Sequence, residues 1–382
     1  MHSSLKSGVR YLIMGLFLLL YAGLNFYLGI RCLEALGSYL STWDAVYWGL
    51  IIFLASAYFL GLVINRKAPG KLSDALVWIG AYYIGFFFYG LLTVLLIDVL
   101  RCVDKIVPFI PMMLKDKPAL TAGIVLLFLT GLMVYGTCNS RRPVLRKYRL
   151  DVPGHDLRLK NLKAVLVSDV HLGNIVGRKR LTGLVRKINQ RQADVVLLAG
   201  DVIDGDARPF VQHDMAGLLR QIKSRYGVLA VLGNHEYLGG QYKEMISALQ
   251  ASGVTVLRDE SVLLQDSLYI IGRDDKYSRN RRKLAELMPE PGNHLPVLIL
   301  DHNPADIQEA ASNGADLQFS GHTHTGQIWP LNFITAKIFA TDWGYLRQGK
   351  LQVIVSNGYA TWGPPIRIGN RPELVEIIIR FR

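Results

Sequence analysis

The sequence predicts an α/β domain that is preceded by four transmembrane helices. Four long apolar stretches lie before residue 138. From residue 157 onward, short apolar runs alternate with segments of helical periodicity, which is the pattern of an α/β fold. Histidines and carboxylates follow several of these apolar runs. We therefore expect residues 1–138 to form a membrane domain, residues 139–156 a basic linker, and residues 157–382 a catalytic domain.

The four apolar stretches each have about the length of ~20 residues that is needed to cross a bilayer. They run over Tyr11–Ile30, Ala45–Ile64, about Leu76–Ile97, and Leu120–Thr137. A signal peptide would explain only the first stretch. Four buried helices of a soluble bundle would be amphipathic, whereas these stretches are apolar on all sides. An integral membrane protein is therefore predicted.

The basic residues of the short loops predict the orientation of the chain. Ten Lys and Arg residues lie in the loops on the side of both termini, against five on the other side. Cytoplasmic loops carry the excess of Lys and Arg. We therefore expect the catalytic domain on the cytoplasmic face of a bacterial-type plasma membrane.

The charge of the chain favours a lipid partner over nucleic acid. The formal net charge is +13, and most of this excess lies in the first 150 residues. A nucleic-acid-binding motif does not accompany it. Anionic lipid head groups attract basic segments next to a membrane. We therefore expect membrane lipids as partners and no nucleic acid.

In the second part of the chain, strands and helices alternate. The expected strands are Leu162–Val167, Val195–Ala199, Val228–Leu232, Val254–Leu257, Val262–Leu264, Leu268–Ile271, Val297–Leu300, Leu317–Phe319, Leu351–Val355 and Leu374–Ile379. The expected helices are Lys179–Gln192, Met215–Ser224, Gln241–Ala251 and Ala305–Ser312. About 225 residues are enough to bury a core of their own.

Five polar blocks follow the apolar runs of this domain. They contain Asp169 with His171, Asp201 with Asp204, Asn234-His235-Glu236, His302, and His322 with His324. Ligand sites of open α/β sheets lie beyond the carboxyl ends of the strands. These side chains are therefore expected to converge there.

The candidate ligands form a mixed nitrogen and oxygen set of two carboxylates, one amide and four imidazoles. Such a set suits first-row divalent ions better than Mg²⁺ or Ca²⁺, which prefer oxygen ligands. Seven ligands exceed the needs of one four-coordinate ion and suit two ions that share a carboxylate. Two metal ions ~3.5–4 Å apart can clamp a phosphoryl centre. We expect two divalent ions, with Mn²⁺ first and Fe or Zn as alternatives.

The same blocks carry a family resemblance. The series D-x-H, G-D-x-x-D, G-N-H-E, a lone His and G-H-x-H runs in this order across Asp169–His324. It resembles the calcineurin-like metallophosphoesterase superfamily. Gly321–Gln327, together with Asn357-Gly358 and Pro365-Ile366-Arg367, is similar to the YkuE/YaeI-like branch. The resemblance covers residues 160–382 and implies a four-layer αββα sandwich that hydrolyses phosphoester bonds with metal-activated water.

The resemblance also implies a role for each residue of the series. It places the first metal on Asp169, His171 and His324, the second on Asn234, His302 and His322, and Asp201 between them. It makes His235 a residue that contacts the phosphate and helps to stabilise or protonate the leaving oxygen. It makes Asp204 the carboxylate that orients His235. Asp301 and Glu236 are expected to support the site or to be solvated rather than to bind metal.

The substrate remains open at this level. The membrane half favours a lipid-linked phosphodiester, phosphomonoester or pyrophosphate, such as UDP-2,3-diacylglucosamine. A tethered phosphatase or nuclease for soluble substrates and a non-catalytic scaffold are the alternatives. The basic run between Arg273 and Lys283 either binds substrate phosphates or forms a solvated face.

Overall fold

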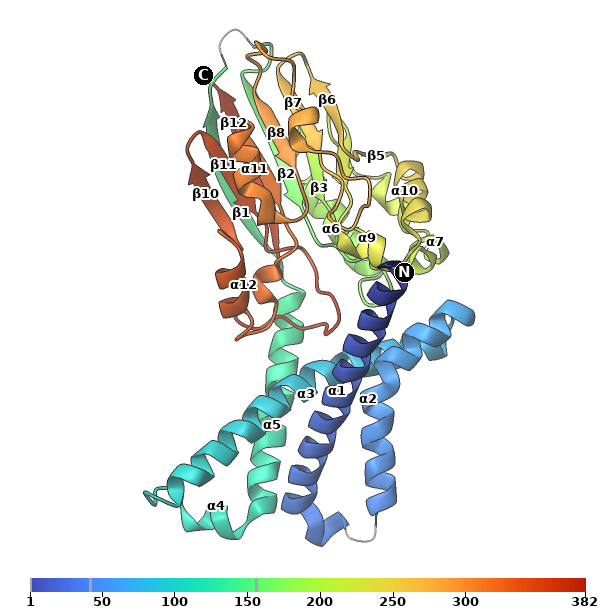
Figure 1. Cartoon of the computed structure of the whole chain (residues 1–382), viewed down its shortest axis with the longest axis vertical. Coiled ribbons are helices and arrows are strands. Elements are labelled where there is room, and N and C mark those ends of the chain that lie inside the picture. The colour runs from blue at the N-terminus through green and yellow to red at the C-terminus, as the bar shows by residue number, and fades with distance from the viewer. Residues whose placement is uncertain (1, 41–42, 155–156) are drawn as a thin grey trace. The chain divides into compact units, whose positions relative to one another are not determined.

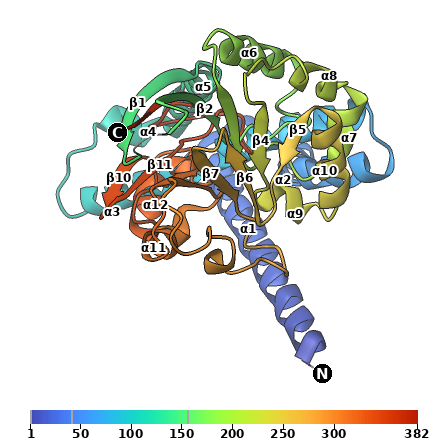
Figure 2. The same cartoon turned by 90° about the horizontal axis from the view of Figure 1, so that it is seen from above.

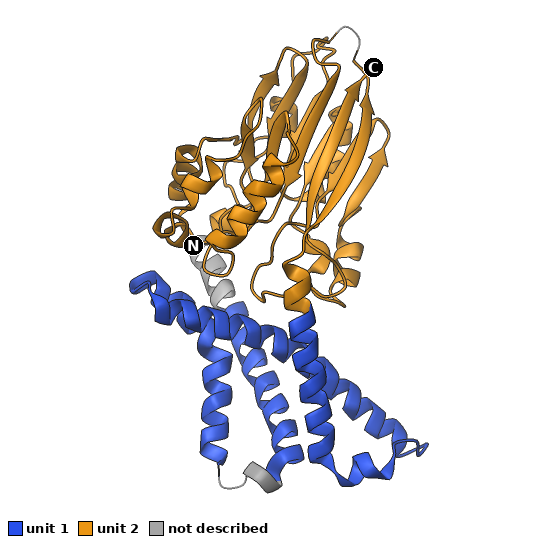
Figure 3. Cartoon of the chain, turned by 180° about the vertical axis from the view of Figure 1, so that it is seen from behind, with its two compact units in different colours: residues 1–135 blue, residues 136–382 orange. Residues whose placement is uncertain are grey.

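The computed structural model describes residues 2–40, 43–154 and 157–382, with side chains from residue 12 to residue 37 in the first helix. The chain divides into two compact units, residues 1–135 and residues 136–382 (Figure 3). Each unit is described by itself below.

The first unit is helical. Its helices are α1 (His2–Leu40), α2 (Asp44–Lys67), α3 (Lys71–Asp104), the short α4 (Met112–Asp116) and most of α5 (Pro118–Ser140) (Figure 1). In the described part of the chain, four helices, α1, α2, α3 and α5, are long and apolar enough to cross a membrane. The helices extend beyond the predicted stretches because apolarity marks only the segment suited to hydrocarbon, whereas helical hydrogen bonding continues past it.

Small and polar residues join the helices of this unit. A side chain at Gly80 of α3 would collide with the backbone of Tyr58 in α2, and a Cβ at Gly61 would lie 2.7 Å from the Val77 nitrogen. Glycine therefore permits the close approach of α2 and α3, as is common between membrane helices. Between α1 and α3, the Tyr83 hydroxyl donates to Asn25 Oδ1 at 2.6 Å.

Two six-stranded sheets form the centre of the second unit. One has the order β1-β12-β2-β3-β4-β5 and the other β10-β11-β9-β8-β7-β6. The first sheet contains β1 (Val144–Val152), β2 (Asn161–Val167), β3 (Val195–Ala199), β4 (Val228–Val231), β5 (Val254–Val256) and β12 (Glu373–Phe381). The second contains β6 (Glu260–Leu264), β7 (Leu268–Gly272), β8 (Val297–Leu300), β9 (Leu317–Ser320), β10 (Gly344–Gln348) and β11 (Leu351–Val355). Parallel pairing joins β2 to β3 to β4 in one sheet and β7 to β8 to β9 in the other, so their carboxyl ends share an edge within each sheet.

Helices cover the outer face of each sheet (Figures 1 and 2). The helical elements are α6 (Arg178–Asn189), α7 (Ala207–Gln212), α8 (Met215–Leu219), α9 (Asn234–Leu238), α10 (Tyr242–Ala251), α11 (Ile307–Ser312) and α12 (Asn332–Ile338), with three short 3-10 turns, Leu284–Glu286, Pro304–Asp306 and His324–Gly326. The sequence analysis did not predict α12 or β10.

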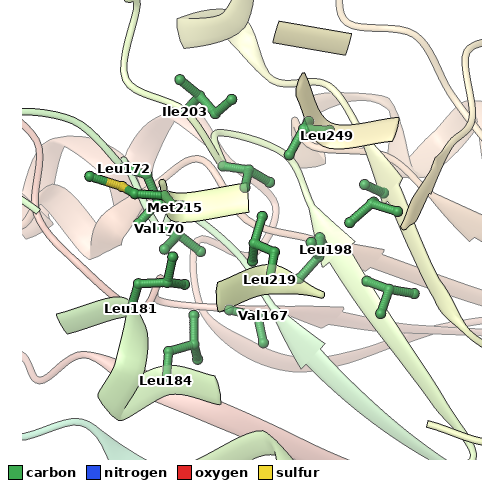
Figure 4. Packing of buried hydrophobic residues seen from close by; sticks show 14 of the residues in the cluster. Val167, Val170, Leu172, Leu181, Leu184, Leu198, Ile203, Met215, Leu219 and Leu249 are labelled. Carbon is green, nitrogen blue, oxygen red and sulfur yellow. The ribbon is translucent and has the colours of Figure 1, made fainter. Parts of the chain in front are cut away.

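The alternation of side chains along β2 shows how the layers are held together. Val165 and Val167 pack into a core with α6, whereas Ala164 and Leu166 pack into a second core against β8 and β9 of the other sheet. Figure 4 shows Val167 in the first of these cores with Leu181 and Leu184 of α6. A third core lies between the second sheet and α11. Because successive strand residues point to opposite faces, apolar runs buried on both faces produce the predicted four-layer sandwich.

The segment expected to be a basic linker, residues 139–156, differs from the prediction. It contains β1, which pairs in parallel with β12 from Val144↔Glu373 to Val152↔Phe381. The second unit already begins at Gly136. The alternating pattern of Tyr148, Leu150 and Val152 was not recognised as a strand because charged residues lie between them. Such charges are typical of the exposed face of an edge strand. Residues 155–156 lie outside the described residues.

Truncation of a core leucine should destabilise the second unit far more than truncation of an exposed one. Leu166 is fully buried between the sheets, whereas Leu263 of β6 is 43% exposed. We expect Leu166→Ala to lower the free energy of unfolding by about 2–5 kcal/mol. Leu263→Ala should change it by less than about 0.5 kcal/mol. Thermal unfolding of the full chain in detergent measures both, and equal shifts would contradict the assigned core.

Candidate metal centre

The polar side chains singled out in the sequence all lie at the carboxyl ends of strands. In the first sheet, Asp169 and Asp201 lie two residues past the ends of β2 and β3, and Asn234 lies three residues past β4. In the second sheet, His302 and His322 lie two residues past the ends of β8 and β9. Both sheets therefore contribute residues. Asp169, His171, Asp201, His322 and His324 have φ between 48° and 73°. Non-glycine residues rarely adopt this left-handed conformation, and such strain concentrates at functional sites.

Asp169, His171 and His324 form one group that could hold a metal ion, with their ligand atoms within 4.8 Å of one another. The Nε2 atoms of His171 and His324 are 3.1 Å apart, and His324 Nε2 lies 3.2 Å from Asp169 Oδ1. All three side chains are buried. Two imidazole nitrogens and a carboxylate oxygen thus converge on one point.

Asp201, His302 and His322 form a second group. His302 Nε2 lies 3.2 Å from Asp201 Oδ2 and 3.2 Å from His322 Nδ1, and the Asn234 amide oxygen lies 2.9 Å from His322 Nδ1. His302 Nδ1 is 2.8 Å from the Ala199 carbonyl oxygen. Because a carbonyl oxygen only accepts, Nδ1 donates to it and Nε2 faces the other ligand atoms. Burial opposes protonation of this ring, but the adjacent Asp201 raises the pKa of His302 well above its ordinary value, so a metal that binds Nε2 displaces a proton.

Asp201 lies between the two groups. Its Oδ2 is 3.2 Å from His302 Nε2 and 3.9 Å from His171 Nε2. Its Oδ1 accepts a hydrogen bond from the His235 backbone nitrogen at 2.8 Å, which fixes the carboxylate. One carboxylate can therefore serve ligand groups on both sides.

The electrostatics of the site suit cation binding. Burial favours the neutral acids, yet the facing imidazoles hold the pKa of Asp169 and of Asp201 below the ordinary range. Burial lowers the pKa of His322 and of His324 to about 4, so both rings are neutral near pH 7. Ionised carboxylates and neutral imidazoles are the forms that bind metals.

His235 differs from the other histidines because its ring pairs with a carboxylate. His235 Nδ1 lies 2.6 Å from Asp204 Oδ1, and the side chain is 18% exposed. Burial opposes protonation, but the bond to Asp204 and the charge of Asp201 raise the pKa of His235 to about 9. The ring lies 4.5 Å from that of His171, centre to centre.

Asp204, His171 and His235 make a third group of metal-ligand type. It shares His171 with the first group through the opposite ring nitrogen, since His171 Nδ1 lies 3.5 Å from Asp204 Oδ1. Because His235 Nδ1 is already bonded to Asp204, we interpret this group as a carboxylate that orients two imidazoles and not as a third metal site.

Glu236 and Asp301 have other partners, as expected. Glu236 is buried and accepts backbone hydrogen bonds from Asp201, Ile203 and Gly233, so it holds the loop after β3. Asp301 accepts from Arg281 Nη2 at 2.7 Å.

The basic run between Arg273 and Lys283 is largely neutralised. Arg273 pairs with Glu309, Lys276 with Asp306, and Arg282 with Glu286. Arg281 binds both Asp301 and Asp306. These cations are therefore committed to carboxylates, which weakens the interpretation of the run as a phosphate receptor.

Arg367 is a site residue that the sequence analysis did not assign a role. It is fully buried, and its Nη2 lies 2.9 Å from His324 Nδ1. Its other nitrogens bind the Ala360 carbonyl and the Asn357 side chain. The only sequence signal was its place in the late Pro365-Ile366-Arg367 segment, because a contact 43 residues from His324 leaves no local pattern.

Comparisons with known proteins define the class of the chain. Residues 162–326 match the family described as calcineurin-like phosphoesterase. An uncharacterized metallophosphoesterase of Aquifex aeolicus is 32% identical over 227 residues, which cover 57% of this chain and 85% of that protein. The chain therefore belongs to the calcineurin-like metallophosphoesterase family, as its sequence motifs predict.

One similar protein also has a name that mentions a membrane part. The bovine transmembrane protein with metallophosphoesterase domain is 31% identical over 284 residues, or 69% of this chain. The match covers 63% of the bovine protein and 57% of a Helicobacter pylori metallophosphoesterase, so the chain aligns with less than two thirds of either relative. The YkuE/YaeI-like branch stays a prediction.

Loss of the shared carboxylate should remove bound metal. We expect Asp201→Asn to weaken metal binding at least tenfold, because the amide is neutral and both ligand groups lose a charge. Elemental analysis of the purified full chain after dialysis measures the metal content. The matched control is Asp266→Asn, whose side chain is 62% exposed and pairs with Arg158. Equal metal content in both variants would contradict the placement of Asp201 between two ions.

Proposed function

We propose that the chain is a membrane-anchored hydrolase that uses two divalent metal ions to cleave a phosphoester bond with water. The observation that carries this proposal is the position of Asp201, which is within reach of imidazoles on both sides. In this proposal Asp169, His171 and His324 hold one ion, Asn234, His302 and His322 hold the other, and Asp201 bridges them.

The donor atoms support a metal-binding role. Imidazole nitrogens that face one another at 3.1–3.2 Å need a cation or a proton between them. The set contains nitrogen and oxygen donors, which fits Mn²⁺, Fe or Zn better than Ca²⁺ or Mg²⁺. When bound, such a pair of ions lowers the pKa of water and polarises the phosphoryl oxygens. Elemental analysis would distinguish the three metals.

His235 and Asp204 supply the acid of the proposed reaction. Asp204 accepts the Nδ1 proton of His235, which leaves Nε2 free to face the substrate. With its pKa raised to about 9, the imidazolium carries a proton near pH 7. A protonated ring at the edge of the site can stabilise the phosphoryl charge and donate its proton to the leaving oxygen.

Removal of this acid should abolish turnover without removing metal. We expect His235→Ala to lower kcat about 10²–10⁴-fold on a phosphoester with a poor leaving group. Metal content should be that of the unmodified chain. His213→Ala is the control, since His213 is exposed and lies at the end of α7. A kcat loss confined to variants that also lose metal would contradict an acid role for His235.

For the substrate we propose a lipid-linked phosphodiester, phosphomonoester or pyrophosphate, with UDP-2,3-diacylglucosamine as one candidate. Four helices of membrane-spanning length and the basic excess of the first 150 residues support it. The distribution of basic loops favours a catalytic domain on the cytoplasmic side of a bacterial-type membrane. A phosphatase or nuclease for soluble substrates is the alternative.

A matched substrate panel separates these alternatives. We expect the detergent-purified chain with Mn²⁺ to show at least tenfold higher kcat/KM on an acylated phosphodiester or pyrophosphate than on its deacylated counterpart. A preference for the deacylated compound would exclude the lipid-linked substrate. Failure to hydrolyse any phosphoester, with metal bound, would favour a non-catalytic scaffold.

A further inference from the structure

An exposed apolar surface borders the candidate metal centre. None of the described residues of α12 is buried, even though three of them are large and apolar. Phe333, Ile334 and Ile338 are 58%, 54% and 66% exposed. Trp329 and Trp362 are each about half exposed. A surface helix ordinarily buries its apolar side chains, and large exposed apolar patches mark interaction sites. We call these five side chains the apolar rim.

Hydrogen bonds join the two loops that carry the apolar rim. Gln327 Nε2 donates to the Trp362 carbonyl at 2.9 Å, and Gln327 Oε1 accepts from the Trp362 nitrogen at 3.1 Å. The Trp329 nitrogen donates to the Ile368 carbonyl at 2.8 Å. The loop before α12 and the loop of residues 360–369 therefore form one surface.

The second of these loops is bonded to the end of a helix of membrane-spanning length. Asn139 Nδ2 donates to the carbonyls of Arg367 and Asn370, and Ser140 Oγ donates to the Pro365 carbonyl at 3.1 Å. The Arg367 nitrogen donates to the Gly136 carbonyl at 3.0 Å. All these residues belong to the second compact unit.

These bonds attach the loop of residues 360–369 to the last turn of α5. Helix α5 has 23 residues, and a helix of that length rises about 34 Å. A hydrocarbon core is ~30 Å thick, so the last turn of α5 lies at the head-group level if α5 spans the membrane.

Charge around the apolar rim matches an anionic lipid surface. Arg141 and Arg142 are exposed directly after α5, Lys337 is exposed on α12, and Arg371 is exposed with its Nη2 on the Arg142 carbonyl. Tryptophan prefers the membrane interface, and basic side chains are attracted by anionic head groups. An apolar face with basic flanks is typical of an interfacial segment.

Trp362 of the apolar rim lies next to His235, and Phe339, which follows α12, lies next to the candidate ligand His322. The ring of Trp362 lies 6.0 Å from that of His235, and Phe339, directly after α12, has its ring 6.1 Å from that of His322. Thr323, between the two G-H-x-H histidines, donates from Oγ1 to the Asp342 carbonyl at 2.5 Å. A substrate phosphate at the metal centre would have the rest of its molecule next to the apolar rim.

We propose that the apolar rim inserts into the interface of the bilayer that anchors the chain, so that the metal centre receives the phosphoester head group of an acylated lipid from the bilayer surface. The first part of this proposal, the docking of the apolar rim, is supported by its exposed residues and by the contacts with α5. The second part, the delivery of a lipid substrate, which we call the substrate half, rests on the proposed hydrolase function.

Docking is tested with a fluorescent label on the full chain in lipid nanodiscs. In a background with Cys32, Cys102 and Cys138 changed to alanine, Ile334→Cys is labelled with a polarity-sensitive probe. We expect brominated lipids to quench this label at least twofold. The matched control is Leu263→Cys, an exposed aliphatic position on β6, whose label should be quenched little. If the label at Ile334→Cys is quenched no more than the control label, docking is overturned. This outcome would occur if protein, and not lipid, covered α12.

The substrate half is tested with a triple variant, Phe333→Ser, Ile334→Ser and Ile338→Ser. We expect kcat/KM on an acylated phosphodiester in vesicles to fall at least tenfold, while kcat/KM on a soluble aryl phosphodiester changes less than twofold. Equal loss on both substrates, or loss on neither, overturns delivery from the bilayer. If the unmodified chain hydrolyses no phosphoester while the label is quenched, the proposed function fails and docking is supported.

Discussion

The second unit depends on the burial of ionisable side chains at one edge of two packed sheets. Asp169, Asp201, His302 and His324 are each at most 2% exposed. Buried charges are costly unless they are paired or coordinate a metal. One nitrogen of His302 and one of His324 bind the surrounding fold, through the Ala199 carbonyl and Arg367. Their other ring nitrogens face further imidazoles of the cluster. The fold therefore keeps an arrangement that a divalent cation stabilises.

The four-layer architecture makes this arrangement possible. The first sheet supplies Asp169, Asp201 and Asn234 from the ends of β2, β3 and β4, and the second supplies the histidines after β8 and β9. The core between the sheets fixes the distance between the two sets. Backbone hydrogen bonds join neighbouring loops within each sheet, since the Asp169 nitrogen donates to the Gly200 carbonyl in the first and the Gly321 nitrogen to the His302 carbonyl in the second. Between the sheets, the Ala360 nitrogen, in the segment after β11, donates to the Asp169 carbonyl.

Arg367 connects the metal-ligand cluster with the end of α5. Its side chain contacts His324, its nitrogen donates to Gly136, and its carbonyl accepts from Asn139. A buried guanidinium with several partners holds its neighbours in one geometry. The last turn of a helix of membrane-spanning length is thereby part of the packing of the second unit, which explains why this unit begins at Gly136 and not after the expected linker.

The sequence alone determined the four apolar helices, most strands and all of the residues of the cluster, because apolar runs and the spacing of ligand-type residues are local properties. It did not determine that residues 144–152 pair with β12, that α12 leaves its apolar side chains exposed, or that Arg367 reaches His324. Those features depend on contacts between segments far apart in the chain, such as Val144 with Glu373. The tertiary structure alone determined these three features. Strand pairing and burial depend on contact partners that cannot be identified from the local sequence.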